Sequence, residues 1–265
     1  MRPARPDFWI ASPVRAALIY FFILFAPPIS AQRLKDFTTP TPLPAGSTLI
    51  VGFLGGIEKW KDEHRPVNQL AKRLRALGLP GVFVETAEHA RRGDVLKLIE
   101  AAAGRISKGR CAAQGCRAVR LILYGHSMGA AGVVKLARDL GQFGLPVALT
   151  VQVDSVGASD DVIPPNVARA ANLYQSDSWL LHGRTLIRAE DPSHTLILAN
   201  LRYSYEGKWV DLSDATPPER VAHTRHSEME FDPQVWNRVE DYILDELHRA
   251  GIPGAPAPPH PLTPQ

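Results

Sequence analysis

The segment with the clearest chemical potential is a serine between two glycines, since residues 125–129 read Gly-His-Ser-Met-Gly. It follows an apolar run that ends at Tyr124 and precedes a helical pattern that starts near Met128. Such a turn holds a serine on a sharp bend, where bulkier neighbours would collide with the adjoining strand and helix. The helix N-terminus at this point favours developing negative charge. The pattern therefore predicts that Ser127 is a nucleophile.

A serine hydroxyl is a poor nucleophile unless a neighbouring base takes its proton, and that base is most often histidine. Four histidines lie between Ser127 and the last predicted helix: His182, His194, His223 and His226. The base in turn needs a carboxylate that accepts its other ring proton and stabilises the imidazolium. The sequence therefore has to supply one histidine and one acid in addition to the serine.

Two aspartates are candidates for that acid. Asp154 directly follows the apolar run 147–153, and Asp177 lies in a polar loop after the next predicted strand. A carboxylate that leaves a buried strand is held in a fixed direction, whereas one in a polar loop needs other groups to orient it. We therefore favour Asp154 and keep Asp177 as the alternative.

The elements that must position these residues follow from hydrophobic periodicity between residues 47 and 250. Short apolar runs typical of strands cover residues 48–53, 82–84, 119–124, 147–153 and 168–174. Amphipathic helical patterns separate several of these runs, and a last one covers residues 235–247. Repeated strand-helix-strand order predicts an α/β fold with a mostly parallel sheet flanked by helices. In such sheets the chemistry gathers at the carboxyl ends of the strands, where Ser127 and Asp154 lie.

With its strand, Gly-x-Ser-x-Gly turn and helix, the chain resembles the α/β-hydrolase superfamily from residue 47 to residue 247. It is most similar to lipase-like and esterase-like members. The resemblance implies a triad in the order Ser-Asp-His, with the histidine in a loop before the final helix. His226 fits that place, because Asp232 and Pro233 predict the N-cap and first turn of that helix. Residues 226–233 also resemble the histidine-containing segment of bacterial lipase-like proteins, and His223 is the nearest rival.

The resemblance also implies an oxyanion hole built from two backbone amides. One is the amide of Met128, after the nucleophile, and the other comes from residues 52–56, with Leu54 preferred. The His-Gly dipeptide common in the family is replaced here by Gly52-Phe53, so the second donor stays open.

The reaction implied by the resemblance is hydrolysis of a carboxylic ester through an acyl-enzyme on Ser127. We expect no cofactor and no metal, because the phosphate-loop and His-Glu-x-x-His zinc motifs are absent from the sequence. The expected partner is a small-molecule ester or acyl substrate, in an open site, since residues 155–167 leave little chain for a lid. The alternatives are a peptidase, amidase or thioesterase on the same fold, or a non-catalytic binding protein that retains it.

Composition supports one globular domain and argues against a nucleic-acid partner. The chain has 265 residues, of which 45% are hydrophobic and 22% charged, with a net charge of +3. Lysines and arginines alternate with acids, so the concentrated basic face of a nucleic-acid-binding protein is not expected. We predict four segments: a signal peptide at 1–31, a lead-in at 32–46, the hydrolase domain at 47–250 and a proline-rich disordered tail at 251–265.

The first segment predicts a secreted or periplasmic protein. Three arginines precede the unbroken apolar run 16–26, and small residues precede Gln32. Eleven helical residues span only about half of a bilayer core, so a membrane is a partner only if this segment stays uncleaved. In an exported protein, Cys111 and Cys116 are expected to form a disulfide; free thiols or a metal pair are the alternatives.

Overall fold

The computed structural model describes residues 31–106, 110–111, 117–178 and 181–260, and its compact unit begins at Gln32. A six-stranded sheet forms the centre of this unit, in the order β10-β8-β6-β5-β1-β2. The strands are β1 (Thr48–Leu54), β2 (Val82–Glu88), β5 (Arg120–His126), β6 (Val147–Val153), β8 (Val167–Tyr174) and β10 (Leu196–Arg202). Every neighbouring pair is parallel. The predicted mostly parallel sheet is confirmed.

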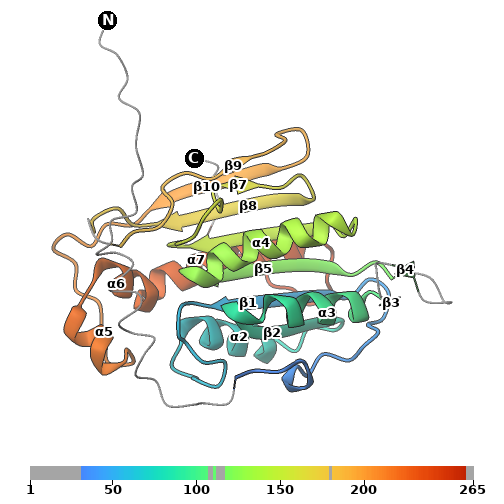
Figure 1. Ribbon diagram of the computed structural model, residues 1–265, viewed down its shortest axis with the longest axis horizontal. Helices are drawn as coiled ribbons and strands as arrows, with labels where there is room; N and C mark the ends of the chain where they lie inside the picture. The colour runs from blue at the N-terminus through green and yellow to red at the C-terminus, as the bar shows by residue number, and fades with distance from the viewer. Residues whose placement is uncertain (1–30, 107–109, 112–116, 179–180, 261–265) are drawn as a thin grey trace, which may run out of the picture. The chain divides into compact units, whose positions relative to one another are not determined.

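Helices cover both faces of the sheet (Figure 1). The long helices are α2 (Pro66–Ala76), α3 (Arg92–Ala102), α4 (Met128–Gln142) and α7 (Pro233–Arg249). One hydrophobic cluster joins α2 and α7 to the sheet, and a second joins α3 and α4 to it. The sheet is therefore the middle layer of three, as the α/β-hydrolase fold requires.

The remaining elements are short. They are the single-turn helices η1 (Leu34–Asp36) and η2 (His89–Arg91), the helices α5 (Pro217–Ala222) and α6 (Arg225–Phe231), and two small sheets. One small sheet pairs β3 (Arg105–Ile106) with β4 (Arg110–Cys111), and the other pairs β7 (Val162–Ile163) with β9 (Arg188–Ala189). Periodicity did not predict β10, since its burial is irregular along the strand.

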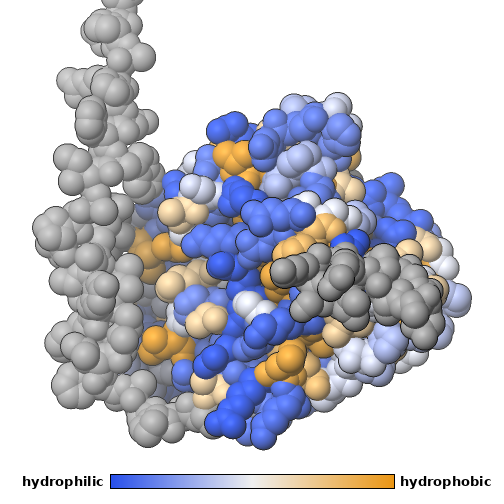
Figure 2. Space-filling model, turned by 45° about the vertical axis from the view of Figure 1, so that its right-hand side comes forward, coloured by the Kyte–Doolittle hydropathy of each residue, from blue (hydrophilic) through white to orange (hydrophobic). Residues whose placement is uncertain are grey.

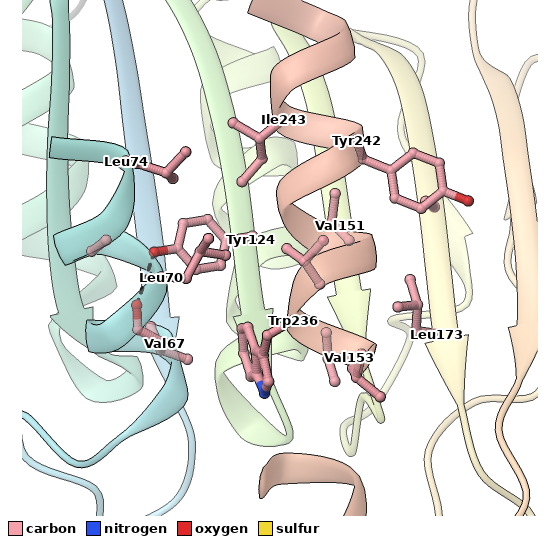
Figure 3. Packing of buried hydrophobic residues seen from close by; sticks show 14 of the residues in the cluster. Val67, Leu70, Leu74, Tyr124, Val151, Val153, Leu173, Trp236, Tyr242 and Ile243 are labelled. Carbon is pink, nitrogen blue, oxygen red and sulfur yellow. Dashed lines mark hydrogen bonds between the residues drawn. The ribbon is translucent and has the colours of Figure 1, made fainter. Parts of the chain in front are cut away.

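The central strands are apolar because both of their faces are covered. All seven residues of β1 are buried, including Gly52, which lies inside the strand predicted at 48–53. A Cβ atom on Gly52 would overlap the ring of Tyr124, which fills this space from β5. The Tyr124 hydroxyl donates to the carbonyl of Val67 in α2 at 3.0 Å, and Trp236 and Ile243 of α7 pack nearby (Figure 3). A glycine in the strand therefore allows a buried tyrosine to reach its acceptor.

The predicted lead-in, residues 32–46, packs against the domain instead of standing apart from it. The Gln32 side chain is buried, donates to the carbonyl of Thr86 at 2.8 Å and accepts from the amide of Glu88 at 3.2 Å. Further along, Leu43 is completely buried in the α3–α4 cluster. A carboxylate oxygen of Glu85 in β2 accepts from the amides and hydroxyls of Thr38 and Thr39, so the segment gives a buried polar side chain of this edge strand its partners.

The start of the tail that we predicted to be disordered also lies against the domain. Gly251, at a φ of 67°, turns the chain after α7, and Ile252 and Ala255 pack on the α2–α7 cluster. A proline-rich segment cannot join a sheet ladder, but its apolar side chains still gain by burial. The predicted signal segment and Cys116 lie outside the described residues, so the signal peptide and the disulfide stay predictions.

The visible face in Figure 2 mixes hydrophilic with hydrophobic side chains, and its hydrophobic patches are small and separate. Large exposed apolar side chains include Trp209, Val221, Leu186 and Ile57. Within the described part of the chain, no helix has both the length and the apolar character needed to cross a bilayer.

Candidate active site

The candidate site lies at the carboxyl ends of neighbouring strands. Ser127 directly follows β5, and Asp154 directly follows β6, which pairs with β5 so that His126 lies opposite Val153. From β1 the chain continues to β2 on one side, whereas β5 leads to β6 on the other. Sheets of this kind bind ligands in the crevice where the strand order reverses, which here is between β1 and β5.

Ser127 adopts a backbone conformation that is rare outside glycine, with φ 55° and ψ −123°. Its amide donates to the carbonyl of Val153 at 2.9 Å, and its carbonyl accepts from the amide of Val156 at 3.2 Å. The flanking glycines let the turn close: a Cβ atom on Gly125 would lie 2.8 Å from the carbonyl carbon of Gly129. Strain of this kind persists only where the surrounding structure holds it, and it clusters at functional sites.

Ser127, His226 and Asp154 form a continuous chain of polar contacts. The Nε2 atom of His226 lies 3.0 Å from the Oγ atom of Ser127, and its Nδ1 atom lies 2.6 Å from Oδ2 of Asp154. Asp154 is fully buried and also accepts from the Gly183 amide at 2.6 Å and the Gln175 side chain at 3.0 Å. These donors hold the carboxylate in the direction that meets the imidazole.

The surroundings of the triad favour an ionised Asp154 and a basic His226. Burial by itself raises the pKa of Asp154, but hydrogen bonds from His226, Gln175 and Gly183 outweigh it and lower that pKa below its usual value. Burial likewise disfavours the charged form of His226, yet the hydrogen bond and the charge of Asp154 raise its pKa overall. The aspartate thus makes the histidine a stronger base.

The two rival residues lie elsewhere. Asp177 accepts hydrogen bonds from Arg202 at 2.7 Å, from the Ser204 hydroxyl at 2.8 Å and from the Tyr205 amide at 2.6 Å. His223 is exposed, and its Nε2 atom lies 3.1 Å from Glu228. Asp177 and His223 therefore contact other residues and not the triad, while the structure brings Ser127, Asp154 and His226 together.

His226 belongs to a short helix, α6, where the sequence predicted a loop. Thr224 begins that helix, and its hydroxyl accepts from the Ser227 amide at 3.1 Å. Asp232 is the N-cap of α7, as predicted, and accepts from the Gln234 amide at 3.0 Å. Two successive caps therefore fix the helical turn that carries the imidazole.

The two segments that were expected to supply the oxyanion donors both meet the serine. Met128 is the first residue of α4, so its amide is one of the four that have no partner within the helix. Leu54 ends β1, and a Cβ atom on the following residue, Gly55, would lie 3.1 Å from the Cβ atom of Ser127. The loop after β1 therefore contacts the nucleophile, and the choice of Leu54 as second donor remains a prediction.

A buried polar cluster next to the triad was missed by the sequence analysis. The ring of His126 stacks on that of His226, with centroids 4.7 Å apart and planes at 29°. Glu58 and Glu230 lie close to His126, and Arg65 donates to Glu230 at 2.8 Å. No local pattern could reveal this cluster, because its members come from three segments that are far apart in the sequence.

Burial controls the protonation of this cluster. It raises the pKa values of Glu58 and Glu230 to about 7, although the charge of Arg65 opposes the shift. It also lowers the pKa of His126 to about 4. The neutral form of all three groups is therefore favoured to an unusual degree.

A separate hollow of about 390 Å³ opens at the opposite end of the strands from the triad. It is lined by residues at the amino ends of β5, β6 and β8 and by Glu246 of α7. Ligand sites of parallel sheets lie at the carboxyl ends instead, so this hollow does not compete with the triad as the candidate active site.

Comparison with known proteins adds distant structural neighbours. No protein-family model matches the chain, and no curated protein matches it. A cutinase-like protein from Cryptococcus sp. is 14% identical, with a TM-score of 0.39 over 78% of this chain and 98% of that one. The RedJ thioesterase from the prodiginine pathway of Streptomyces coelicolor is 12% identical, with a TM-score of 0.36 over 77% and 97%. At such low identity and TM-score, these likenesses assign no activity to this chain.

Proposed function

We propose that this protein is a serine hydrolase that cleaves carboxylic esters, with Ser127 as nucleophile, His226 as base and Asp154 as the orienting acid. The observation that carries the proposal is the continuous contact from Oγ of Ser127 through the imidazole of His226 to the buried Asp154. Such a constellation is recognised by its geometry and roles.

In the first step, the Ser127 oxygen attacks the ester carbonyl carbon while His226 Nε2 takes the hydroxyl proton. The carbonyl oxygen becomes an oxyanion, which the amides of Met128 and Leu54 stabilise. When this intermediate collapses, the bond to the alcohol oxygen breaks and His226 returns the proton to the leaving alcohol. Water then attacks the acyl-enzyme with the same base, which releases the acid and restores the serine.

Asp154 stays ionised throughout, because its hydrogen bonds lower its pKa. Its role is to keep the proton of neutral His226 on Nδ1 and to stabilise the imidazolium formed during each transfer. The preformed amides contribute several kcal/mol to the transition state, since removing one such donor typically costs about 3–4 kcal/mol.

We further propose that the protein acts outside the cytoplasm, after cleavage of its N-terminal signal, with Cys111 and Cys116 in a disulfide. Both proposals rest on the sequence: the apolar run at 16–26 with its preceding arginines, and the close spacing of the two cysteines.

A serine-directed fluorophosphonate tests the nucleophile directly. We expect the wild-type protein to be labelled at Ser127, and Ser127→Ala to be unlabelled and inactive while its circular dichroism stays unchanged. Matched ester, thioester and peptide substrates with the same acyl group then compare kcat/KM for the three reaction types. Absence of labelling in folded wild-type protein would favour a non-catalytic binding protein, and faster thioester or peptide cleavage would correct the substrate class.

A further inference from the structure

Three possible metal ligands meet behind the triad: Glu58, His126 and Glu230. One donor atom from each lies within 4.8 Å of the other two. Their side chains are 8%, 2% and 5% exposed, so water has little access to them. None of the three takes part in the proposed ester hydrolysis.

The histidine of this group is buried without a hydrogen bond. Among the described residues, neither ring nitrogen of His126 has a hydrogen-bond partner, and neither does Oε2 of Glu58. The Nδ1 atom of His126 faces Oε1 of Glu58 across 3.5 Å, which is longer than an ordinary hydrogen bond. A buried polar atom without a partner costs free energy of folding, so these unpaired atoms indicate that the group binds a ligand.

The charges around the group favour a cation. Arg65 makes ion pairs with Asp62, Glu219 and Glu230, while Glu58 also lies near it. Burial favours the neutral forms of Glu58 and Glu230, and once all four carboxylates ionise, one guanidinium leaves an excess of negative charge around two buried and two partly exposed carboxylates. A divalent cation would compensate most of that excess.

We propose that Glu58, His126 and Glu230 bind one divalent transition-metal ion of the Zn²⁺ type. An imidazole nitrogen with two carboxylate oxygens suits zinc better than magnesium or calcium, which prefer all-oxygen sites. Zinc binds such atoms at about 2.0–2.2 Å, so the ligands would draw together by roughly 1 Å, with the fourth position left for water. The inference stands independently of the proposed ester hydrolysis.

The placement of the ligands indicates a structural role for the ion. Glu58 belongs to the loop after β1, His126 is the last residue of β5 before the nucleophile, and Glu230 lies on α6 with His226. One ion at this point would tie together the three segments that carry the second oxyanion donor, the serine and the histidine. Because these segments are far apart in the sequence, the ion would cross-link them only in the folded state.

The test begins with mature protein stripped by a chelator and then dialysed against Zn²⁺. We expect elemental analysis to find about one zinc per chain, and Tm to rise by about 5–10 °C at a roughly hundredfold excess over Kd. X-ray absorption should show one nitrogen and carboxylate oxygens around the zinc. Glu58→Gln and His126→Gln should lose the bound zinc, whereas Glu219→Gln should keep it, because Glu219 contacts Arg65 but is not a ligand.

Three results would overturn the site. The first is wild-type protein that takes up no stoichiometric zinc, in which case the group holds protons or water only. The second is zinc that both Glu58→Gln and His126→Gln retain. The third is an X-ray absorption spectrum that shows sulfur or several imidazoles around the zinc. Either of these two results would place the ion elsewhere. The absorption measurement uses wild-type protein, so it decides the matter even if a variant fails to fold.

Discussion

Replacing Asp154 with asparagine tests the proposed triad most sharply, because both carboxylate oxygens have named partners. Oδ2 lies 2.6 Å from Nδ1 of His226 and accepts from the Gln175 side chain at 3.0 Å. Oδ1 accepts from the backbone amides of Gly183 at 2.6 Å and Gln175 at 3.3 Å. An asparagine has the same shape but only one accepting oxygen.

Either orientation of the new amide produces a conflict. If its oxygen faces Gly183, its NH₂ group meets the Gln175 side-chain donor and donates to Nδ1 of His226. The imidazole then carries its proton on Nε2, which faces Ser127 and can no longer accept the hydroxyl proton. If the amide turns over, its NH₂ group meets the Gly183 amide at the 2.6 Å separation of the present hydrogen bond. The first orientation costs less, so the wrong tautomer should dominate.

From this wrong tautomer and the lost stabilisation of the imidazolium we expect kcat to fall about 10⁴-fold. That factor corresponds to about 5 kcal/mol of transition-state free energy. Asp177→Asn is the matched control, since Asp177 contacts Arg202, Ser204 and Tyr205 but not His226.

The assay is initial-rate hydrolysis of a chromogenic short-chain ester by both variants, with circular dichroism to show that each is folded. We expect Asp177→Asn to change kcat little. If folded Asp154→Asn keeps roughly a tenth of the wild-type rate or more, the tautomer reasoning is refuted. If Asp177→Asn proves the severe change, the acid has to be reassigned.

Three further predictions concern pH, packing and export. Asp154 raises the pKa of His226 above its usual 6.5, so kcat/KM should rise with pH through a midpoint above 6.5. Any residual activity of Asp154→Asn should have a lower midpoint. A wild-type midpoint below 6.5 would contradict this reasoning. Gly129→Ala should lower Tm by several degrees in a thermal melt, because its Cβ atom would overlap the carbonyl oxygens of β1, at a cost of about 1–3 kcal/mol. Gly132→Ala is its control, with 3.9 Å of space to the nearest atom, and equal losses in the two variants would refute the packing argument. Mass spectrometry of protein from its native compartment should find a chain starting near Gln32 whose two cysteines are joined, and free thiols would rule out the disulfide.

Local sterics and periodicity made much of the fold predictable. The runs of buried residues in β1, β5 and β6 are nearly continuous because helices cover both faces of the sheet, and such runs are visible in the sequence itself. The turn around Ser127 was also predictable, since Gly125 and Gly129 are needed at fixed spacing by contacts within one strand-turn-helix unit. The helix cap at Asp232 depends likewise on neighbouring residues.

The sequence by itself therefore determined the four long helices, five of the six strands of the central sheet, the strained turn and the two aspartates from which the acid had to come. Only the tertiary structure decided which aspartate meets His226, because Asp154 and His226 are 72 residues apart and meet through the pairing of β6 with β5 and the packing of α6. The same holds for the group of Glu58, His126 and Glu230, and for the packing of residues 32–46 on β2. Local patterns follow from contacts between neighbours in the chain, whereas these contacts exist only after distant segments have packed and lost water together.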